Sequence, residues 1–590
     1  MNPAVLRTVL CIAAALAPAL AQVPDFKPVT QEMLENPSPD DWLMFSRTYD
    51  AQRYSPLKQI NEQNVGTLRL AWSRGLTPGT TETIPTVYRG VMYVTEPGSN
   101  VEALDATTGD LIWEYKRKYA NPGVGTGGRS KTLAIFDDMI YFAAPDSYVV
   151  ALDARTGALR WETKADARGH TSGAIVVDGK VLAGGTCNAG LRANCYIGAY
   201  DAHTGKEVWR FYTTQAANDP AGDSWAGAPE EKRTASTWGL PGSYDPVRKL
   251  IYWGIANPTP NTRAARHGGN AFAIPLAAPA DLYSNSTVAL DPTTGKLAWY
   301  YQHLPGDDWD EDINEERTLI RTPVNPDPKY VKWINPAIPK GQVRDISVNV
   351  GEGGGMWAID RGTGQFLWAT PFPFDVPNFI LSGIDVKTGI AHINEDLIVG
   401  EPGQRRLICF FNTRSYWPTA YHPAKNSLYV PYYDVCLDQT SAKPATADSP
   451  AAPERRVGGH RQGSDPNNYV GLAKVNMSTG EIQRWSTGSR ANSTGAALAT
   501  AGDLVFWGDL NRRLRAFDAD TGKILWEQIV GGTISVSTIT YAVNGKQYLS
   551  VITGDNLAVP GLLGENNFAA ATPEYKPGRG HNAIYTFSLP

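Results

Sequence analysis

Short apolar segments separated by polar turns run along almost the whole chain. Segments such as Val91–Val94 and Met139–Phe142 are followed by a second apolar segment that ends in Ala-x-Asp-x-x-[Thr/Gly]-Gly, and a third segment then carries Trp. Asp can cap a tight turn through its own side chain, and Gly adopts positive φ there without strain. This pattern therefore predicts β-hairpins, and the chain is expected to be all-β with short antiparallel strands.

The Asp–Gly–Trp unit recurs along the chain. Complete copies are ALDATTGDLIW (Ala103–Trp113), ALDARTGALRW (Ala151–Trp161), AYDAHTGKEVW (Ala199–Trp209), ALDPTTGKLAW (Ala289–Trp299), AIDRGTGQFLW (Ala358–Trp368) and AFDADTGKILW (Ala516–Trp526). A degenerate copy contains Asn476, Gly480 and Trp485, and Trp72 follows a strand without the turn. Four-stranded units of this kind cannot bury their faces alone, and eight of them closing radially give an eight-bladed β-propeller with the Trp docked between blades. A Trp-rich β-sandwich is the alternative.

The distances between the repeat tryptophans predict where the ring is interrupted. A bare blade needs about 40 to 50 residues, and the gaps after Trp209, Trp299 and Trp368 are longer. We therefore expect one propeller domain over residues 22–590, with insertions near 212–285, 303–345 and 372–470. Within the last one, Ser441–Pro466 is rich in Ala, Pro, Asp and Arg and is expected to form an irregular surface loop.

Composition excludes several classes of protein. The 590 residues are 42% hydrophobic and 19% charged, which is enough apolar surface for a large core and argues against disorder. The 57 glycines and 42 prolines show no Gly-X-Y period, so the chain is not collagen-like. A net charge of −5 gives no basic footprint for nucleic acid, and no such partner is expected.

The N-terminus has the features of an export signal. Arg7 supplies the positive charge, Val9–Leu20 is apolar, and Ala19-Leu20-Ala21 is an A-x-A cleavage signature. We expect residues 1–21 to be a cleaved signal peptide and the mature chain to be periplasmic. An uncleaved anchor is the alternative, but this apolar segment is short, and no other stretch approaches ~20 uncharged residues, so no membrane span is expected.

Cleavage would remove Cys11 and leave four cysteines: Cys187, Cys195, Cys409 and Cys436. An even number in an oxidising compartment favours two disulfides. Nearest-neighbour pairing is the simplest of three connectivities. A zinc site is the alternative, although the chain has no C-x-x-C and no clustered His. The absence of C-x-x-C-H excludes covalent c-type haem.

Three features together resemble a known family. The Trp repeats, the opening segment Asp41–Trp72 and the acidic sequence DDWDED (Asp307–Asp312) are similar to pyrroloquinoline quinone (PQQ)-dependent alcohol dehydrogenases of the methanol/ethanol type, over nearly the whole mature chain. The resemblance implies PQQ at the propeller centre with Ca²⁺ or a lanthanide ion beside it. It also implies hydride transfer from an alcohol to PQQ, with a soluble cytochrome c as electron acceptor. The chain is further similar to quinoproteins that oxidise bulky secondary alcohols, including trichothecene toxins such as deoxynivalenol.

The resemblance assigns a base and metal ligands. Asp310 matches the catalytic Asp, and a carboxylate beside a metal ion can take the hydroxyl proton. Asp312 matches a second Asp of the lanthanide-using branch, while Asn257 matches an Asn metal ligand. Oxygen ligands suit Ca²⁺ and lanthanides alike, so both ions stay open. Composition alone favours a solvated acidic loop for this stretch.

The resemblance also assigns PQQ-binding residues. Trp238 matches the Trp whose indole lies beneath the quinone, because a planar aromatic cofactor needs such a floor. Lys131, or alternatively Arg129, takes the place of an Arg near the quinone oxygens, where a cation would stabilise developing negative charge. Glu82 matches a Glu at the rim of PQQ, and Thr171 and Thr186 match two hydroxyl positions that bond the PQQ carboxylates.

The sequence departs from the family pattern at three positions. Gly127-Gly128 stands where the family often has two adjacent cysteines over PQQ, and Thr186–Cys195 contains no carboxylate where the family has a Glu metal ligand. Glu352 lies near the place of the family's quinone Arg, with Arg414 as a candidate substitute. These departures indicate a divergent branch, in which Asp312 is expected to compensate for the missing Glu.

Two other functions compete with the dehydrogenase. A non-catalytic propeller that acts as an assembly scaffold of the cell envelope would need the blade tryptophans but not Trp238, Asn257 and Asp310 together. A hydrolase could use a carboxylate pair of Asp310 with Glu315 or Glu316. The joint presence of the three site residues favours the dehydrogenase.

Overall fold

The structure is a computed structural model, which describes residues 22–119, 130–166, 169–187, 192–443, 450–465, 467–487, 495–555 and 580–590. The expected signal peptide (residues 1–21), Gly127-Gly128 and Arg129 lie outside this part of the chain. The chain is nearly all-β, as predicted, with two short α-helices, α1 (Gln31–Glu35) and α3 (Arg263–Arg266), in the described ranges. Within the same ranges, no helix has the length and apolarity needed to cross a membrane.

Most strands belong to antiparallel sheets of four strands in near-sequential order. The first three sheets are β3 (Thr86–Tyr88), β4 (Val91–Glu96), β5 (Asn100–Asp105) and β6 (Leu111–Tyr115); β7 (Ala134–Phe136), β8 (Met139–Ala144), β9 (Tyr148–Asp153) and β10 (Leu159–Lys164); and β11 (Ala174–Val177), β12 (Lys180–Gly184), β13 (Tyr196–Asp201) and β14 (Glu207–Tyr212).

The next three sheets have longer connections between their strands. They are β16 (Ser243–Asp245), β17 (Leu250–Gly254), β19 (Ser286–Leu290) and β20 (Leu297–Gln302); β21 (Thr318–Val324), β23 (Gln342–Val350), β24 (Met356–Asp360) and β25 (Phe366–Thr370), extended by β22 (Trp333–Ile334); and β29 (Ala420–His422), β30 (Ser427–Tyr433), β33 (Val470–Asn476) and β34 (Ile482–Ser486).

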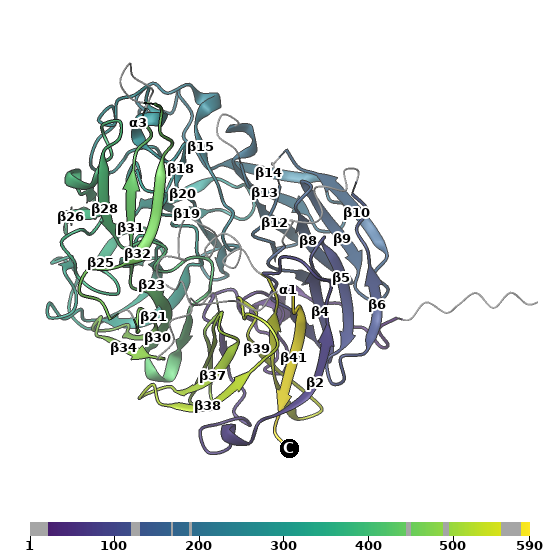
Figure 1. The fold of residues 1–590 in the computed structure, drawn as a ribbon. Coiled ribbons are helices and arrows are strands. Elements are labelled where there is room, and N and C mark those ends of the chain that lie inside the picture. Colours follow the sequence, from purple (N-terminus) through teal and green to yellow (C-terminus); the bar gives the residue numbers. More distant parts are fainter. Residues whose placement is uncertain are drawn as a thin grey trace, which may run out of the picture.

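The last two sheets close the ring. One contains β35 (Leu498–Thr500), β36 (Leu504–Gly508), β37 (Arg513–Asp518) and β38 (Ile524–Ile529), with β1 (Tyr54–Ser55) added in parallel. In the other, β39 (Ile539–Val543), β40 (Lys546–Thr553) and β41 (Ala583–Ser588) pair with the N-terminal β2 (Arg69–Gly75). Figure 1 shows β2 beside β41 and the sheets arranged around a common centre. The propeller is confirmed; the count of eight blades stays a prediction that these eight sheets support.

The repeated motif forms the hairpin that the sequence predicts. At the end of β5, the Asp105 carboxylate accepts a hydrogen bond from the Thr107 amide at 2.7 Å. Gly109 follows at φ 77°, a backbone conformation that residues with a side chain rarely adopt. The equivalent hydrogen bond recurs at Asp201, whose carboxylate accepts from the His203 amide at 3.2 Å, and Gly205 has the same backbone conformation with φ 70°. The turn chemistry therefore repeats with the sequence.

Each Trp of the regular repeats docks on the turn of the next blade. The Trp72 indole donates to the Ala106 carbonyl at 3.1 Å, and a Cβ added at Gly109 would lie 2.5 Å from the Trp72 ring. Trp113 and Trp161 repeat this contact with Ala154 and Ala202. The predicted docking of Trp between blades is therefore confirmed, and it explains why Gly is needed beside it.

Both predicted disulfides are present. Cys187 is bonded to Cys195 and Cys409 to Cys436, which is the nearest-neighbour connectivity. Cys409 on β28 (Arg405–Cys409) and Cys436 on β31 (Val435–Thr440) lie directly opposite each other in paired antiparallel strands. This second bond ties together two strands that lie outside the four-stranded sheets.

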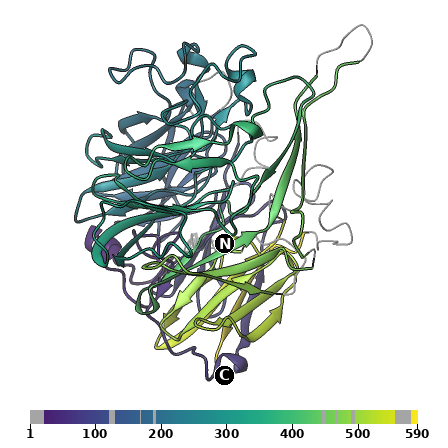
Figure 2. The same ribbon diagram turned by 90° about the vertical axis from the view of Figure 1, so that its left-hand side faces the viewer.

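The prediction of an irregular loop over Ser441–Pro466 is wrong in part. Arg455–His460 forms strand β32, which pairs with β31 from Val435↔His460 to Thr440↔Arg455. Long-range pairing overrides the loop-like composition here, because β31 offers a complete backbone ladder. We call the sheet β28–β31–β32 the arm; Figure 2 shows green strands of this region projecting from the ring. Two further sheets of two strands each lie outside the ring sheets. They are β15 (Thr234–Ala235) with β18 (Pro258–Thr259), and β26 (Leu381–Ile384) with β27 (Ala391–Ile393).

Candidate active site

The predicted site residues occupy equivalent places in successive blades. The first strand of a sheet is its buried edge: β3 is fully buried, whereas β6, at the other edge, is largely exposed. Loops that enter these inner strands meet around the centre of a propeller. Residues that lie three to eight positions before an inner strand are Glu82, Lys131, Thr171, Trp238, Asp310, Asp312 and Arg414.

Five residues that the resemblance assigns to PQQ are connected by direct contacts. The Lys131 ammonium lies 3.4 Å from Glu82 Oε2 and donates to the Trp238 carbonyl at 3.2 Å. The Thr171 hydroxyl donates to the same carbonyl at 3.0 Å and lies 3.3 Å from the Thr186 hydroxyl. Lys131 and Glu82 are fully buried, so their charges lie in a medium of low dielectric constant where the pair interacts strongly.

Tyr416 completes this group and was missed in the sequence. Its hydroxyl donates to Glu82 Oε1 at 2.9 Å, and its ring centroid lies 5.8 Å from that of Trp238 in an edge-to-face arrangement. The Lys131 ammonium lies 4.8 Å from the Tyr416 ring centroid, a favourable cation–π distance. Tyr416 has no place in the blade repeat, so periodicity gives no signal for it.

The three predicted metal ligands also lie together. The Asp312 carboxylate accepts hydrogen bonds from the Trp238 indole at 2.6 Å and from the Asn257 amide nitrogen of the backbone at 2.7 Å. The Asn257 side-chain nitrogen donates to Asp310 Oδ1 at 2.8 Å. Rotating this side-chain amide by 180° would turn its oxygen toward Asp310 instead, which is the orientation that a shared cation requires.

The loop that carries Asp310 is held in one conformation. Asp310 has φ 67°, in the left-handed region that Asp tolerates better than most residues. Asp307 accepts from the backbone nitrogens of Trp309 at 2.8 Å and Glu311 at 2.9 Å. Asp308 accepts from the Val399 backbone nitrogen at 2.6 Å. These acceptors make the acidic stretch a rigid buried turn and not the solvated loop that composition alone suggests.

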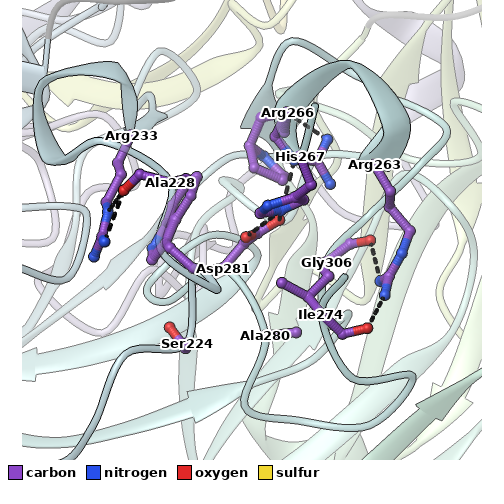
Figure 3. Close-up of polar contacts among 12 residues, drawn as sticks. Ser224, Ala228, Arg233, Arg263, Arg266, His267, Ile274, Ala280, Asp281 and Gly306 are labelled. Atoms are coloured by element: carbon purple, nitrogen blue, oxygen red, sulfur yellow. Dashed lines mark hydrogen bonds and ion pairs between the residues drawn. The ribbon is translucent and has the colours of Figure 1, made fainter. Parts of the chain in front are cut away.

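Helix α3 braces the same loop from the other side. Arg266 pairs with the buried Asp281 at 3.0 Å, and His267 Nε2 lies 3.0 Å from the same carboxylate. Arg263 donates to the carbonyls of Gly306, at 2.9 Å, and Ile274, at 2.7 Å. Figure 3 shows these arginines reaching from the helix toward Asp281 and Gly306. The residues just before Asp307 are therefore anchored by buried guanidinium groups.

Negative charge exceeds positive charge around Asp312. Burial, and then the neighbouring Asp310 carboxylate, raise the pKa of Asp312 well above its usual value. Burial and the charge of Asp312 do the same to the pKa of Glu352, and burial and Glu352 to that of Glu311. Both carboxylate oxygens of Glu311 are buried and lack a hydrogen-bond partner among the described residues. A cation would relieve this excess, and the all-oxygen ligand set fits Ca²⁺ or a lanthanide.

Arg414, the candidate substitute for the quinone Arg, is held by contacts with neighbouring blades' residues. Its guanidinium forms a buried ion pair with Glu316 and donates to the Val350 carbonyl at 3.0 Å. Glu316 also accepts from the Thr419 hydroxyl at 2.8 Å, so its carboxylate is committed to structural contacts. The hydrolase alternative loses one of its two possible partners for Asp310 as a result.

Arg456, a residue that the sequence analysis did not single out, contacts Asp310. Arg456, on β32 of the arm, forms an ion pair with Asp310 Oδ2 and donates to the Trp309 carbonyl. It lies in the stretch expected to be an irregular loop, and 146 residues separate it from Asp310. Neither spacing nor composition signals such a contact.

Comparison with known proteins identifies the family. Residues 163–332 and 468–549 match the family model described as "PQQ: Glucose/ethanol/alcohol dehydrogenase, beta-propeller domain". The chain is 31% identical to the quinohemoprotein alcohol dehydrogenase ADH-IIG of Pseudomonas putida, with 91% of this chain and 75% of the relative covered. It is also 31% identical to the lanthanide-dependent methanol dehydrogenase of Methylorubrum extorquens, with 92% and 90% covered. The chain belongs to the PQQ-dependent alcohol dehydrogenases.

The structure agrees with this family assignment. A europium-containing methanol dehydrogenase superposes with a TM-score of 0.78 at 27% identity, over 95% of this chain and 100% of that one. The first matched range of the PQQ dehydrogenase model contains Thr171, Thr186, Trp238, Asn257 and Asp310. A second family model, "Outer membrane protein assembly factor BamB", matches residues 64–223, which contain the regular blades but not the last three of those residues. Membership implies PQQ together with Ca²⁺ or a lanthanide as cofactors.

Proposed function

We propose that this PQQ-dependent dehydrogenase is a periplasmic enzyme that oxidises an alcohol to an aldehyde or ketone and passes the electrons to a soluble cytochrome c. We further propose bulky secondary alcohols, such as trichothecene mycotoxins, as its substrates. One observation carries the chemistry: an unbroken chain of contacts joins Asp310, Asn257, Asp312 and Trp238. The base, the metal ligands and the aromatic floor that the reaction needs are thus neighbours.

The residues of the candidate site have different roles in this proposal. Thr171 and Thr186 offer the hydroxyl groups that would hold the carboxylates of PQQ, Lys131 offers an ammonium for its quinone oxygens, and Trp238, half-buried, would lie against its ring. When bound, the cofactor supplies a two-electron acceptor for the hydride of the alcohol. The carboxylate oxygens of Asp310 and Asp312 and the Asn257 amide would hold the cation.

Asp310 takes the hydroxyl proton in this proposal. Its side chain is 36% exposed, whereas Asp312 is buried, so Asp310 is the carboxylate of the pair that a substrate can reach. The proton moves from the alcohol oxygen to a carboxylate oxygen of Asp310 as the hydride leaves the carbon. A cation beside this carboxylate would favour its ionised form and so keep it ready to accept the proton.

The proposal about substrate size rests on the sequence. Gly127-Gly128 stands in place of the two adjacent cysteines that the family often has over PQQ, and the chain carries long insertions after Trp209, Trp299 and Trp368. Both features favour a roomier entrance than methanol needs. Residues 1–21 support export to the periplasm, where an electron-accepting cytochrome c would be met.

A reconstitution experiment tests this function. Purified apoprotein is loaded with PQQ and either Ca²⁺ or La³⁺, and dye reduction is measured with methanol, ethanol, cyclohexanol and deoxynivalenol. We expect activity only with PQQ and a metal together, and higher kcat/KM for the bulky secondary alcohols. Asp312→Ala should abolish La³⁺ activation before it affects folding. Loss of all quinone absorbance on desalting would support the scaffold alternative, and full activity after chelation would support the hydrolase.

A further inference from the structure

Arg456 is a partly buried cation that the insertion places against Asp310. It belongs to β32 and lies opposite Gln439 of β31, at the end of the arm nearest the acidic loop. One guanidinium nitrogen pairs with Asp310 Oδ2, and a second donates to the Trp309 carbonyl. The guanidinium therefore contacts both the side chain of Asp310 and the backbone immediately before it, which restrains the orientation of the carboxylate.

The two oxygens of Asp310 are divided between two parts of the chain. Oδ1 accepts from the side chain of Asn257, which follows β17 of the ring, at 2.8 Å. Oδ2 is held by Arg456 from the arm. An Asp side chain fixed at both oxygens has little freedom left about its terminal torsion. Its direction is then set jointly by a blade and by the insertion.

The part of the arm that carries Arg456 is held in place by further contacts. The Arg456 guanidinium lies 5.5 Å from the centroid of the Phe411 ring, and Gln439 donates to the Asp308 carbonyl at 3.4 Å. The Cys409–Cys436 bond joins β28 to β31 in the same sheet. The position of Arg456 thus depends on a covalently linked sheet and not on a free loop.

We propose that Arg456 is a positioning residue for the proton-accepting Asp310, and that its charge weakens binding of the active-site cation. The inference rests on the proposed function. An Arg remains protonated at any working pH, so a fixed positive charge shares one carboxylate with the cation. The guanidinium and the active-site cation repel each other at this range. Arg456 therefore lowers the affinity for the cation while it orients Asp310.

Removing Arg456 should strengthen cation binding and lower turnover. These opposite effects distinguish a positioning role from a purely structural one. Replacing Arg456 with Gln removes the charge and the ion pair, so the cation should bind more tightly while turnover falls. A variant that is only damaged in its fold would lose both properties. Lys keeps the charge but not the two-nitrogen contact, and Arg456→Lys should therefore keep the affinity of the unsubstituted protein and recover only part of its turnover.

Terbium binding and turnover test the proposal together. Tb³⁺ is titrated into the PQQ-free protein and its emission is sensitised by Trp238, whose indole nitrogen lies 2.6 Å from Asp312. We expect Arg456→Gln to lower the Kd for Tb³⁺ about tenfold. In the PQQ- and La³⁺-loaded enzyme, it should lower kcat about 100-fold with KM changed less than about threefold.

Arg455→Gln is the matched control, because Arg455 is the adjacent residue on β32, carries the same charge and has a side chain 62% exposed. We expect its Kd and kcat to stay within about twofold of the unsubstituted protein. Tb³⁺ affinity that Arg456→Gln leaves unchanged or weakens would overturn this inference alone. No sensitised emission from the unsubstituted protein would overturn the proposed metal site and this inference with it.

Discussion

The ring contains two unlike regions. From β2 to β14, each docking Trp bonds to the turn of the next blade, as Trp72, Trp113 and Trp161 do. In the following sheets, the indole nitrogens of Trp299 and Trp368 are buried without a hydrogen-bond partner among the described residues. The second region therefore lacks the indole hydrogen bond at two of its repeat tryptophans, although Trp299 still packs on Gly364, and it also supplies most of the residues around Asp310. Regular docking holds the ring, while the irregular part is arranged around the reaction.

The largest expected effect belongs to the irregular region and concerns activity alone. Asp310→Asn removes the proton acceptor but keeps the shape of the side chain, and we expect kcat to fall about 10²- to 10⁴-fold. The unfolding midpoint should hardly change, because Asn can still accept at one oxygen. Dye-linked turnover with PQQ and La³⁺ measures the first quantity, and thermal unfolding of the metal-free protein measures the second.

Asp110→Asn is the matched control in the regular region, since Asp110 is exposed in a blade turn. Its kcat should stay within about twofold. PQQ should still be retained by the Asp310→Asn protein after desalting. Retained turnover in that variant would show that another group accepts the proton, and the division of the ring into stabilising and reacting regions would lose its main support.

The same division explains what the sequence could predict. Asp105, Gly109 and Trp113 recur with a period, so periodicity and turn chemistry suffice to predict the hairpins, the docking and the propeller. The residues of the site do not recur, and Trp238, Asn257 and Asp310 were found only through resemblance to a family. Arg456 and Tyr416 were missed, because their contacts with Asp310 and Glu82 span 146 and 334 residues. Contacts over such separations are decided by the closed ring and leave no local pattern.

The second prediction concerns stability in the regular region. An Ala at Gly157 would place its Cβ 2.5 Å from the Trp113 ring, on a backbone with φ 73°. Overpacking and the left-handed backbone should together lower the free energy of unfolding by about 3 kcal/mol. Gly179→Ala is the control, because Gly179 has φ 69° but nothing within 4 Å of the added Cβ. It should lose only about 1 kcal/mol in chemical denaturation. Equal losses would mean that the Trp–Gly contact contributes little to docking.

The third prediction concerns pH and returns to the irregular region. Burial raises the pKa of Glu315 to about 7, although Arg414 and Arg317 act in the opposite direction. Because the folded state holds this proton more tightly than the unfolded chain, the contribution to stability is present below the unfolded pKa and is lost as pH rises through about 7. Between pH 5 and pH 8, the metal-free protein should lose about 2 kcal/mol more than its Glu315→Gln variant.

Denaturant unfolding at both pH values checks this slope, and Asp110→Asn serves again as control because Asp110 is exposed in a blade turn of the regular region. The control should keep the pH dependence of the unsubstituted protein. If Glu315→Gln leaves the pH dependence of the free energy of unfolding unchanged, the Glu315 carboxylate is ionised in the folded state. Its charge is then balanced by neighbouring groups and not by a bound proton. The contrast between the buried acidic cluster of the irregular region and the hydrogen-bonded turns of the regular one would then be smaller than the structure indicates.

The smallest effect compares the two kinds of blade interface directly. Trp113 donates its indole N–H to the Ala154 carbonyl at 3.1 Å, whereas the buried Trp368 N–H has no partner among the described residues. Both substitutions with Phe remove a similar volume, so their cavity terms should largely cancel in the difference. Only Trp113→Phe also loses a hydrogen bond, and it should therefore destabilise the protein by about 1 kcal/mol more than Trp368→Phe. Urea unfolding of the two variants under identical conditions measures this difference. A larger loss of unfolding free energy for Trp368→Phe would mean that packing of the ring, without the indole hydrogen bond, holds neighbouring blades together.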